Sequence, residues 1–223
     1  MIEKNVFTEV KKMDYQKKYL YRARVAGAIM RLVPFIKMVG LNGSVACGDA
    51  TEKSDIDFLI IARAGRLYTA RAFATFLIQL TGYRRHGDKI AGRICLNCYL
   101  SDEYLSIELE KESQNQKVAR ANKYLVALVD SDNVAARFFE ENKWFDEYTG
   151  ASIQYTDKIR KKLIPNGPRK PIKIFEIFLY GGLGDLVERY LMNYQIKRIL
   201  SGKKPGDEIY VTENFIKLHP KKY

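Results

Sequence analysis

Two aspartates spaced two residues apart open the most apolar stretch of the chain. The segment 55–62 reads DIDFLIIA, and its β-branched and apolar residues are typical of a buried strand. Side chains alternate between the faces of a strand, so we expect Asp55 and Asp57 to face the same way while Ile56 enters the core. The strand rise places these carboxylates about 7 Å apart along the backbone. Adjacent acids repel one another, so we expect a cation between them.

A Gly-Ser pair lies just upstream of these acids. Gly43 and Ser44 follow a short apolar run, 37–41, which we expect to form a neighbouring strand, and ten residues separate Ser44 from Asp55. That spacing leaves room for a short helix and a turn back to the adjacent strand. Glycine lets phosphate groups approach the backbone closely, and exposed N–H groups and the serine hydroxyl can bind them. The pattern therefore predicts a nucleotide phosphate site beside two acids.

The ligand types indicate which cation these acids would bind. Carboxylate and phosphate oxygens favour Mg²⁺ or Mn²⁺ over Zn²⁺. Two such ions about 3.5–4 Å apart are the usual arrangement for phosphoryl transfer. Cys95 and Cys98 have the CxxC spacing of zinc ligands, but the sequence has no second pair, so we expect both in the core.

Periodicity predicts an α/β first half and a mainly helical second half. The expected helices are 14–33, 67–78, 116–129, 134–145 and 174–200, and the expected strands are 37–41, 55–62 and 93–100. Residues 157–173, with three prolines and seven basic side chains, are expected to form an exposed linker, and 208–218 an extended tail. The glycines at 181–184 predict a kink or close helix packing. We predict a catalytic domain at 1–112 and a basic, mainly helical acceptor-binding region at 113–223.

The stretch 43–61, GSVACGDATEKSDIDFLII, resembles the signature of the DNA polymerase beta superfamily of nucleotidyltransferases. It is most similar to the minimal nucleotidyltransferases, whose pattern is Gly-Ser, a small-residue helix, Gly-Asp-Ala, and Ser-Asp-Ile-Asp before apolar residues. The matching residues are Gly43, Ser44, Gly48, Asp49, Ala50, Ser54, Asp55, Ile56 and Asp57. The resemblance implies an α+β fold of the two-layer nucleotidyltransferase type: a small mixed sheet with helices on one side, extended here by C-terminal helices.

The resemblance also implies a reaction and the residues that carry it. A nucleoside monophosphate would pass from a nucleoside triphosphate, such as ATP, to an acceptor hydroxyl, with release of pyrophosphate. Gly43, Ser44 and Ser54 would bind the nucleotide. Asp55 and Asp57 would be the catalytic acids that hold Mg²⁺ or Mn²⁺.

The family places a third acid on a neighbouring strand, and this chain departs from that pattern. In the expected strand 93–100 the central polar residue is Asn97, whose amide can ligate a metal weakly but cannot act as a base. Asp102, Glu108 or Glu110 would take that place if the strand register differs. A chain without the third acid could instead be a catalytically weak or inactive protein that binds nucleotide or nucleic acid.

The charge distribution indicates an anionic partner. The chain has 38 basic and 26 acidic residues, and residues 151–223 alone hold 15 basic against 7 acidic. An asymmetric basic surface suits RNA, with a tRNA-like end as one option, or another polyanionic acceptor; a basic protein with no nucleic-acid partner is the alternative. Arg84, Arg85 and His86 precede the third strand and are candidate contacts to phosphate or acceptor, unless they form a plain solvated loop.

Other acceptors stay open at this point. They are a protein hydroxyl, as in AMPylating toxin–antitoxin relatives, and a small-molecule hydroxyl, as in antibiotic-modifying relatives. The sequence shows no apolar run long enough for a membrane span and no apolar signal region near its start, and its three cysteines are too few for a disulfide framework. We expect a cytoplasmic protein with no membrane partner.

Overall fold

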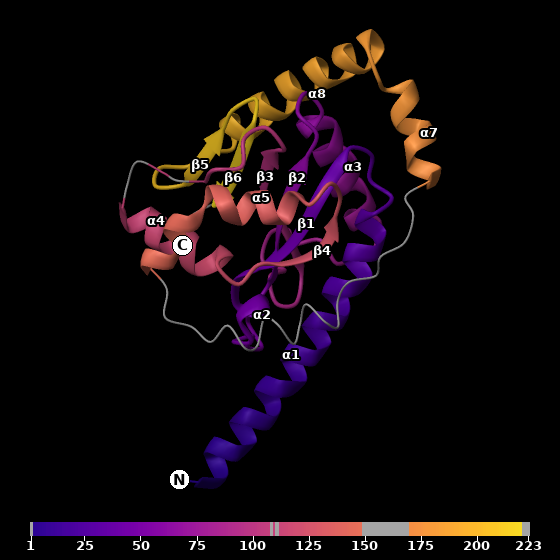
Figure 1. Cartoon of the computed structure of the whole chain (residues 1–223). Helices are drawn as coiled ribbons and strands as arrows, with labels where there is room; N and C mark the ends of the chain where they lie inside the picture. Colours follow the sequence, from indigo (N-terminus) through magenta and orange to yellow (C-terminus); the bar gives the residue numbers. More distant parts are fainter. Residues whose placement is uncertain (1, 108, 110–111, 149–169, 220–223) are drawn as a thin grey trace.

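Strand β2 (Ile56–Ala62) lies inside a six-stranded mixed sheet with the order β4-β1-β2-β3-β6-β5. The computed structural model describes residues 2–107, 109, 112–148 and 170–219. In it, β1 (Ile36–Asn42) is antiparallel to β2, and β3 (Ile94–Ser101) is parallel to it (Figure 1). The three strands expected from the sequence are therefore direct neighbours.

The outer strands come from the second half of the chain. β4 (Val126–Asp130) pairs with β1, and β6 (Phe215–His219) lies between β3 and the edge strand β5 (Glu208–Val211). The expected helix over 116–129 is wrong at its end, because the β-branched run VALV pairs with β1 as a strand. The expected tail is the β5–β6 hairpin, so strands from both sides of residue 113 build one sheet.

Helices cover both faces of this sheet. One face is covered by α1 (Ile2–Met30), α3 (Leu67–Leu80) and α8 (Gly182–Ser201). The other face is covered by α4 (Glu112–Asn122), α5 (Val134–Glu141) and the 3₁₀-helix η1 (Lys143–Tyr148). The predicted mixed sheet of an α/β protein is confirmed, and the structure places helices on two faces where we expected them on one side.

The apolar run of β2 explains the second helical layer. Phe58 and Ile60 are buried in the core beneath α1, α3 and α8, whereas Leu59 and Ile61 are buried beneath α4, α5 and η1. A strand with one solvated face alternates apolar and polar residues, but a strand buried on both faces is continuously apolar. By the same alternation, Asp57 lies on the face of Leu59 and Ile61, which α4 covers.

Helix α1 is longer than the sequence pattern predicted. It begins at Ile2 rather than near Asp14 and ends at Met30, four residues before Pro34. Figure 1 shows its first half projecting from the body of the molecule, while its second half lies against the sheet. The apolar face expected from the spacing of Tyr21 and Val25 is wrong, because both side chains are exposed; the helix packs on the core through Tyr19, Ala23 and Met30.

Two helices replace the single helix expected over 174–200. α7 (Lys170–Phe178) is separated from α8 at Gly181, whose φ of +84° favours glycine. Gly184 also has no room for a side chain, because a Cβ there would lie 1.8 Å from the carbonyl oxygen of Leu179. The expected interruption of the helix is therefore confirmed, with a physical reason at each of the two glycines.

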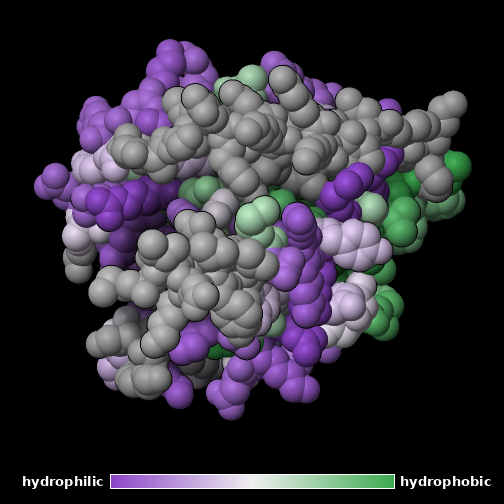
Figure 2. Space-filling view, turned by 90° about the horizontal axis from the view of Figure 1, so that it is seen from below, coloured by the Kyte–Doolittle hydropathy of each residue, from purple (hydrophilic) through white to green (hydrophobic). Residues whose placement is uncertain are grey.

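The outward faces of α7 and α8 remain apolar. Ile177, Phe178 and Tyr190 are 69%, 72% and 71% exposed. Figure 2 shows hydrophobic side chains gathered on the side of the molecule where α7 lies in Figure 1. No helix within the described ranges combines the length and the apolar character needed to cross a membrane.

Glu188 of α8 caps the beginning of α3. Its Oε1 accepts a hydrogen bond from the N–H of Tyr68 at 2.7 Å, and its Oε2 accepts from the N–H and hydroxyl of Thr69 at 2.8 and 2.6 Å. Gln195, further along α8, donates to the carbonyl of Tyr68 at 2.9 Å and accepts from Arg71 at 2.5 Å. Because the first N–H groups of a helix have no partner inside it, this buried carboxylate binds α8 firmly to α3.

We expect Glu188→Gln to lower the free energy of unfolding by about 1–3 kcal/mol, because buried N–H donors lose a charged acceptor. Chemical denaturation followed by circular dichroism measures the change. Asp185→Asn is the matched control on the same helix: its carboxylate is 55% exposed and pairs with Arg66, so we expect a loss below about 1 kcal/mol. Equal losses in the two variants would contradict the capping role.

Candidate active site

The pairing of β1 with β2 brings the Gly-Ser turn against the second aspartate. Asn42, the last residue of β1, is the strand partner of Asp57. Gly43 follows with a φ of +68°, and a Cβ on it would lie 2.6 Å from Oδ2 of Asp57. Glycine is required here twice over, for its backbone conformation and for the close approach of the carboxylate.

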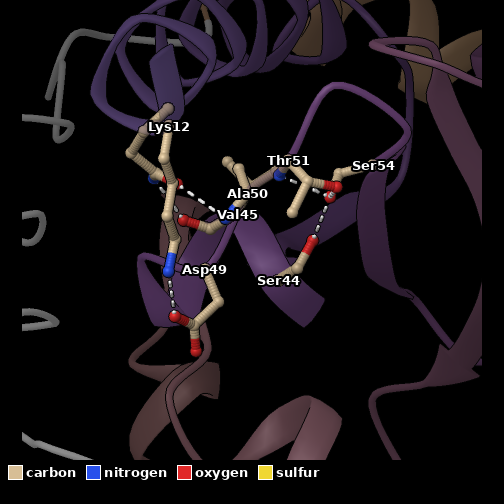
Figure 3. Close-up of polar contacts among 8 residues, drawn as sticks. Lys12, Ser44, Val45, Asp49, Ala50, Thr51 and Ser54 are labelled. Atoms are coloured by element: carbon tan, nitrogen blue, oxygen red, sulfur yellow. Dashed lines mark hydrogen bonds and ion pairs between the residues drawn. The ribbon is translucent and has the colours of Figure 1, made fainter. Parts of the chain in front are cut away.

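Ser44 and Ser54 are linked across the same turn. Ser44 lies in the short helix α2 (Gly43–Cys47), and its hydroxyl donates to Oγ of Ser54 at 3.1 Å. The same Oγ accepts a hydrogen bond from the N–H of Thr51 at 3.0 Å (Figure 3). The structure thus joins the predicted nucleotide-binding serines to each other at the start of the acid-bearing strand.

Helix α1 anchors this turn from behind. The Nε2 of Gln16, a buried residue, donates to the carbonyl of Val45 at 2.8 Å, and its Oε1 accepts from the N–H of Ala50 at 3.2 Å. At the surface, Lys12 pairs with Asp49 at 3.0 Å (Figure 3). Sequence reasoning missed the role of Gln16, because a glutamine in a helix carries no signal of the distant backbone that it binds.

Asp55, Asp57 and Cys95 form a tight cluster. Their ligand atoms all lie within 4.8 Å of one another, and Ile56 is fully buried as predicted. Cys95 is the partner of Asp57 across the β2–β3 pair. It is buried, as expected, but its thiol faces the acids instead of the apolar core. Burial, reinforced by the negative charge of Asp57, raises the pKa of the Cys95 thiol, so this sulfur stays neutral.

Arg85 supplies positive charge to this cluster. Its guanidinium Nη1 lies 2.5 Å from Oδ2 of Asp55 and 3.3 Å from Sγ of Cys95. Both members of the ion pair are largely shielded from solvent, with side-chain exposures of 20% and 17%. A cation beside the acids was expected, and within the described residues a guanidinium lies next to the first of them.

The other two residues of the predicted Arg84–Arg85–His86 group contact different parts of the loop. Arg84 donates to Oε1 of Gln79 at 3.3 Å on the surface of α3. His86 forms an isolated bridge with Lys89. The structure therefore brings Arg85, and not its two neighbours, to the acid cluster.

Asn97, the candidate for the third ligand position, is not the strand partner of Asp57. Phe58 pairs with Leu96, and the next residue of β2 pairs with Cys98, so a bulge leaves Asn97 outside the register. Asn97 and Asp57 nevertheless line one cavity. The residue directly opposite Asp57 is Cys95, whereas the sequence argument sought the third acid at the position of Asn97.

The alternative acids do not fill that place in the described part of the chain. Asp102 follows β3, and its Oδ1 accepts from the N–H of Ala64 at 2.8 Å, beyond the end of β2 that is remote from Asp55. Glu108 and Glu110 lie outside the described residues. β3 itself therefore presents a thiol and an amide beside Asp57.

The donor atoms fit a hard divalent cation. Asp55 and Asp57 offer carboxylate oxygens, and Asn97 offers an amide oxygen to the cavity that Asp57 also lines. These are the ligand types that Mg²⁺ and Mn²⁺ prefer. Cys95 adds a single sulfur to two carboxylates, and a site with mainly oxygen donors favours Mg²⁺ or Mn²⁺ over Zn²⁺.

Comparison with known proteins gives one match. A family model described as a nucleotidyltransferase domain covers residues 22–163. This range contains the Gly-Ser turn, both aspartates, Arg85 and Cys95, whereas the β5–β6 hairpin and α8 lie beyond it. No curated protein and no solved structure gives a significant match.

We expect Gly43→Ala to lower the free energy of unfolding by more than about 2 kcal/mol, since strain at positive φ, about 1–2 kcal/mol, adds to a clash with Asp57. Gly82→Ala is the matched control, because Gly82 has a φ of +70° and open space around it. Thermal and chemical unfolding of both variants separate the backbone strain, which both variants share, from the clash with Asp57, which only Gly43→Ala has. A loss at Gly43 no larger than at Gly82 would show that the close approach to Asp57 is not constraining.

Proposed function

Because the chain belongs to the family of nucleotidyltransferase-domain proteins, we propose that it transfers a nucleoside monophosphate from a nucleoside triphosphate to an acceptor hydroxyl and releases pyrophosphate. The observation that carries this proposal is the approach of Asp57 to Gly43, since it gathers a phosphate-binding turn and two acids at one place. ATP is one candidate donor.

In this proposal the turn binds the phosphates of the donor. The backbone at Gly43 carries no side chain that would keep a phosphate away. The hydroxyl of Ser44 can turn from Ser54 toward a phosphate oxygen, with Ser54 as the neighbouring polar group. Arg85 can contribute its guanidinium, because phosphate oxygens and the carboxylate of Asp55 are equivalent partners for its N–H groups.

Asp55 and Asp57 would hold Mg²⁺ or Mn²⁺ in a two-metal arrangement. Such ions supply positive charge that offsets the charge developing on the transferred phosphoryl group. The protein's part is to hold the two carboxylates on one face of β2 and to keep the donor phosphates beside them. Most of the rate enhancement would then come from positioning and from electrostatic stabilisation.

The basic surplus supports RNA as the acceptor. Residues 151–223 hold 15 basic against 7 acidic side chains, and a polyanion would bind such a surface through its phosphates. The region after residue 112 would then present the acceptor to the catalytic residues. A protein hydroxyl, as in AMPylation, is an acceptor that the same transfer chemistry allows.

A second candidate function is nucleotide or nucleic-acid binding with little or no turnover. The side chains of β3 favour this candidate. Cys95 is the strand partner of Asp57 and Asn97 lines the same cavity as Asp57, and neither is the carboxylate that the family places on this strand. Neither a neutral thiol nor an amide is an effective base for an acceptor hydroxyl. In the enzyme, the hydroxyl proton would instead pass to water in the open site.

We expect label transfer from α-³²P-labelled nucleoside triphosphates in the presence of Mg²⁺ or Mn²⁺, with total RNA and cellular protein offered as acceptors. Asp55→Asn and Asp57→Asn should each lower the transfer rate by about 10²–10³-fold, because each removes a charge placed for the transition state. Asp49→Asn is the control, since Asp49 lies in the same motif but is 69% exposed and pairs with Lys12.

Three outcomes distinguish the candidates. Transfer that both site variants lose and the control keeps supports the enzyme. Nucleotide binding by the wild type with no transfer to any acceptor supports the binding protein. Transfer that persists in both site variants contradicts the assignment of Asp55 and Asp57.

A further inference from the structure

A cavity of about 130 Å³ lies between α4 and the sheet and begins at Asp57. Its lining includes Asp57 and Asn97 from the central strands and Asn122 from α4. Gly43, Ser44 and Arg85 are not part of this lining. The cavity therefore extends from Asp57 and Asn42, the residue before Gly43, toward β6 and β5.

The far wall of this cavity is the β5–β6 hairpin. Glu208, Phe215 and Lys217 of the hairpin line the cavity, and all three lie beyond the range that the family model matches. The hairpin is held to α4 by a hydrogen bond from the hydroxyl of Tyr210 to Gln114 at 2.8 Å. This wall therefore lies outside the part of the chain that matches the nucleotidyltransferase domain.

Asn42 lines the cavity, and its Oδ1 is a hydrogen-bond acceptor without a partner among the described residues. Nδ2 of Asn122 donates to the carbonyl of Val118 at 2.9 Å, so Oδ1 of Asn122 must accept, and it does so from Nδ2 of Asn42 at 2.7 Å. These two consecutive hydrogen bonds fix which atom of the Asn42 side-chain amide is the nitrogen and which is the oxygen. Its Oδ1 is buried with no hydrogen-bond partner among the described residues, and Asn42 is only 6% exposed. Such an atom is costly unless a ligand or water donates to it.

Lys217 brings a partly buried ammonium group to the same cavity. Within the described residues no hydrogen bond or ion pair is found for it, and its Nζ lies 5.8 Å from the centre of the Tyr210 ring. Burial lowers the pKa of Lys217, so the site makes its positive charge less favourable than in water. A ligand that offers hydroxyl oxygens would compensate this lost hydration.

We propose that this cavity is the acceptor site and that it takes a single hydroxyl-bearing ring, either the terminal ribose of an RNA or a free sugar or cyclitol. The inference rests on the proposed nucleotidyl transfer. Attacking and leaving oxygens lie roughly in line across the phosphorus, so an acceptor must approach from the side opposite the phosphate-binding turn. The cavity borders Asp57, and its lining omits Gly43, Ser44 and Arg85, the groups proposed to bind the phosphates. Its size fits one ring, since a cavity of about 150 Å³ holds benzene.

The transfer step then has a defined balance. A ring hydroxyl oxygen forms a bond to the α-phosphorus of the donor, and the bond from that phosphorus to the bridging oxygen of the β-phosphate breaks. Pyrophosphate leaves with the bonding electron pair, and the hydroxyl proton passes to water. Lys217 donates a hydrogen bond to another hydroxyl group of the ring, and Asn42 accepts one when ring binding shifts its amide enough to expose Oδ1.

The test measures ring binding and label transfer separately on the full chain. Ligand-observed NMR titrations use D-ribose, D-glucose and myo-inositol, and a short RNA is compared with the same RNA ending in a 2′,3′-dideoxy sugar. Ala121→Leu fills the cavity, and Lys217→Met removes its cation. Ala28→Leu and Lys203→Met repeat these changes at exposed positions elsewhere.

We expect at least one probe to bind saturably, with Kd raised about tenfold or more by Ala121→Leu. Lys217→Met should raise it about three- to tenfold, and the controls should leave it within about twofold. Binding of a free ring identifies a small acceptor, and binding of the RNA that depends on its terminal hydroxyl groups identifies an RNA end. Melting curves check that each variant folds. If Ala121→Leu is unstable, the Kd of the probes for Lys217→Met alone tests the cavity as the acceptor site.

The two proposals fail separately. Ring binding weakened by both variants, without label transfer to any acceptor, supports the ring site and counts against the proposed reaction alone. Label transfer that neither variant alters supports the reaction and overturns the cavity as acceptor site. Absence of saturable binding by every probe, or equal binding by the cavity variants and their controls, also overturns it.

Discussion

The approach of Asp57 to the α-carbon of Gly43 is the contact on which the site depends. It exists because Asn42 and Asp57 are partners across β1 and β2, and because Gly43 then turns with a positive φ and no side chain. Burial of β2 on both faces of the sheet preserves that pairing. A one-residue slip of β2 would move Asp57 to the opposite face and expose the apolar residues of the strand. The geometry of the site is therefore a consequence of how the centre of the sheet is buried.

Charge and protonation set what the cluster can do. Within the described residues, Arg85 pairs with Asp55, and the Cys95 thiol beside the two acids is kept neutral by burial. Such a cluster retains negative charge that a divalent cation can offset. With an amide and a thiol beside Asp57, the described strand supplies charge and position but no additional base. Catalysis of the proposed kind would then rely on electrostatics and on alignment of the acceptor.

The sequence predicted the centre of the molecule and missed much of its surroundings. The strand at 55–62, the turn at 43–44 and the shared face of the two aspartates follow from local rules of periodicity and backbone conformation, and all are present in the structure. A short apolar run such as VALV fits a helix or a strand, and only its pairing with β1 decides between them. The partnership of Asp57 with Cys95, and the bulge at Asn97, depend on a register that no local pattern encodes.

The most direct test of the central claim is a crystal structure with Mn²⁺ and a non-hydrolysable nucleoside triphosphate analogue, using anomalous scattering to locate the metal. The account predicts an anomalous peak coordinated by oxygens of both aspartates on β2, with phosphate oxygens of the analogue at the turn that begins with Gly43. A peak bound elsewhere on the protein, or an analogue whose phosphates lie away from that turn, would contradict it.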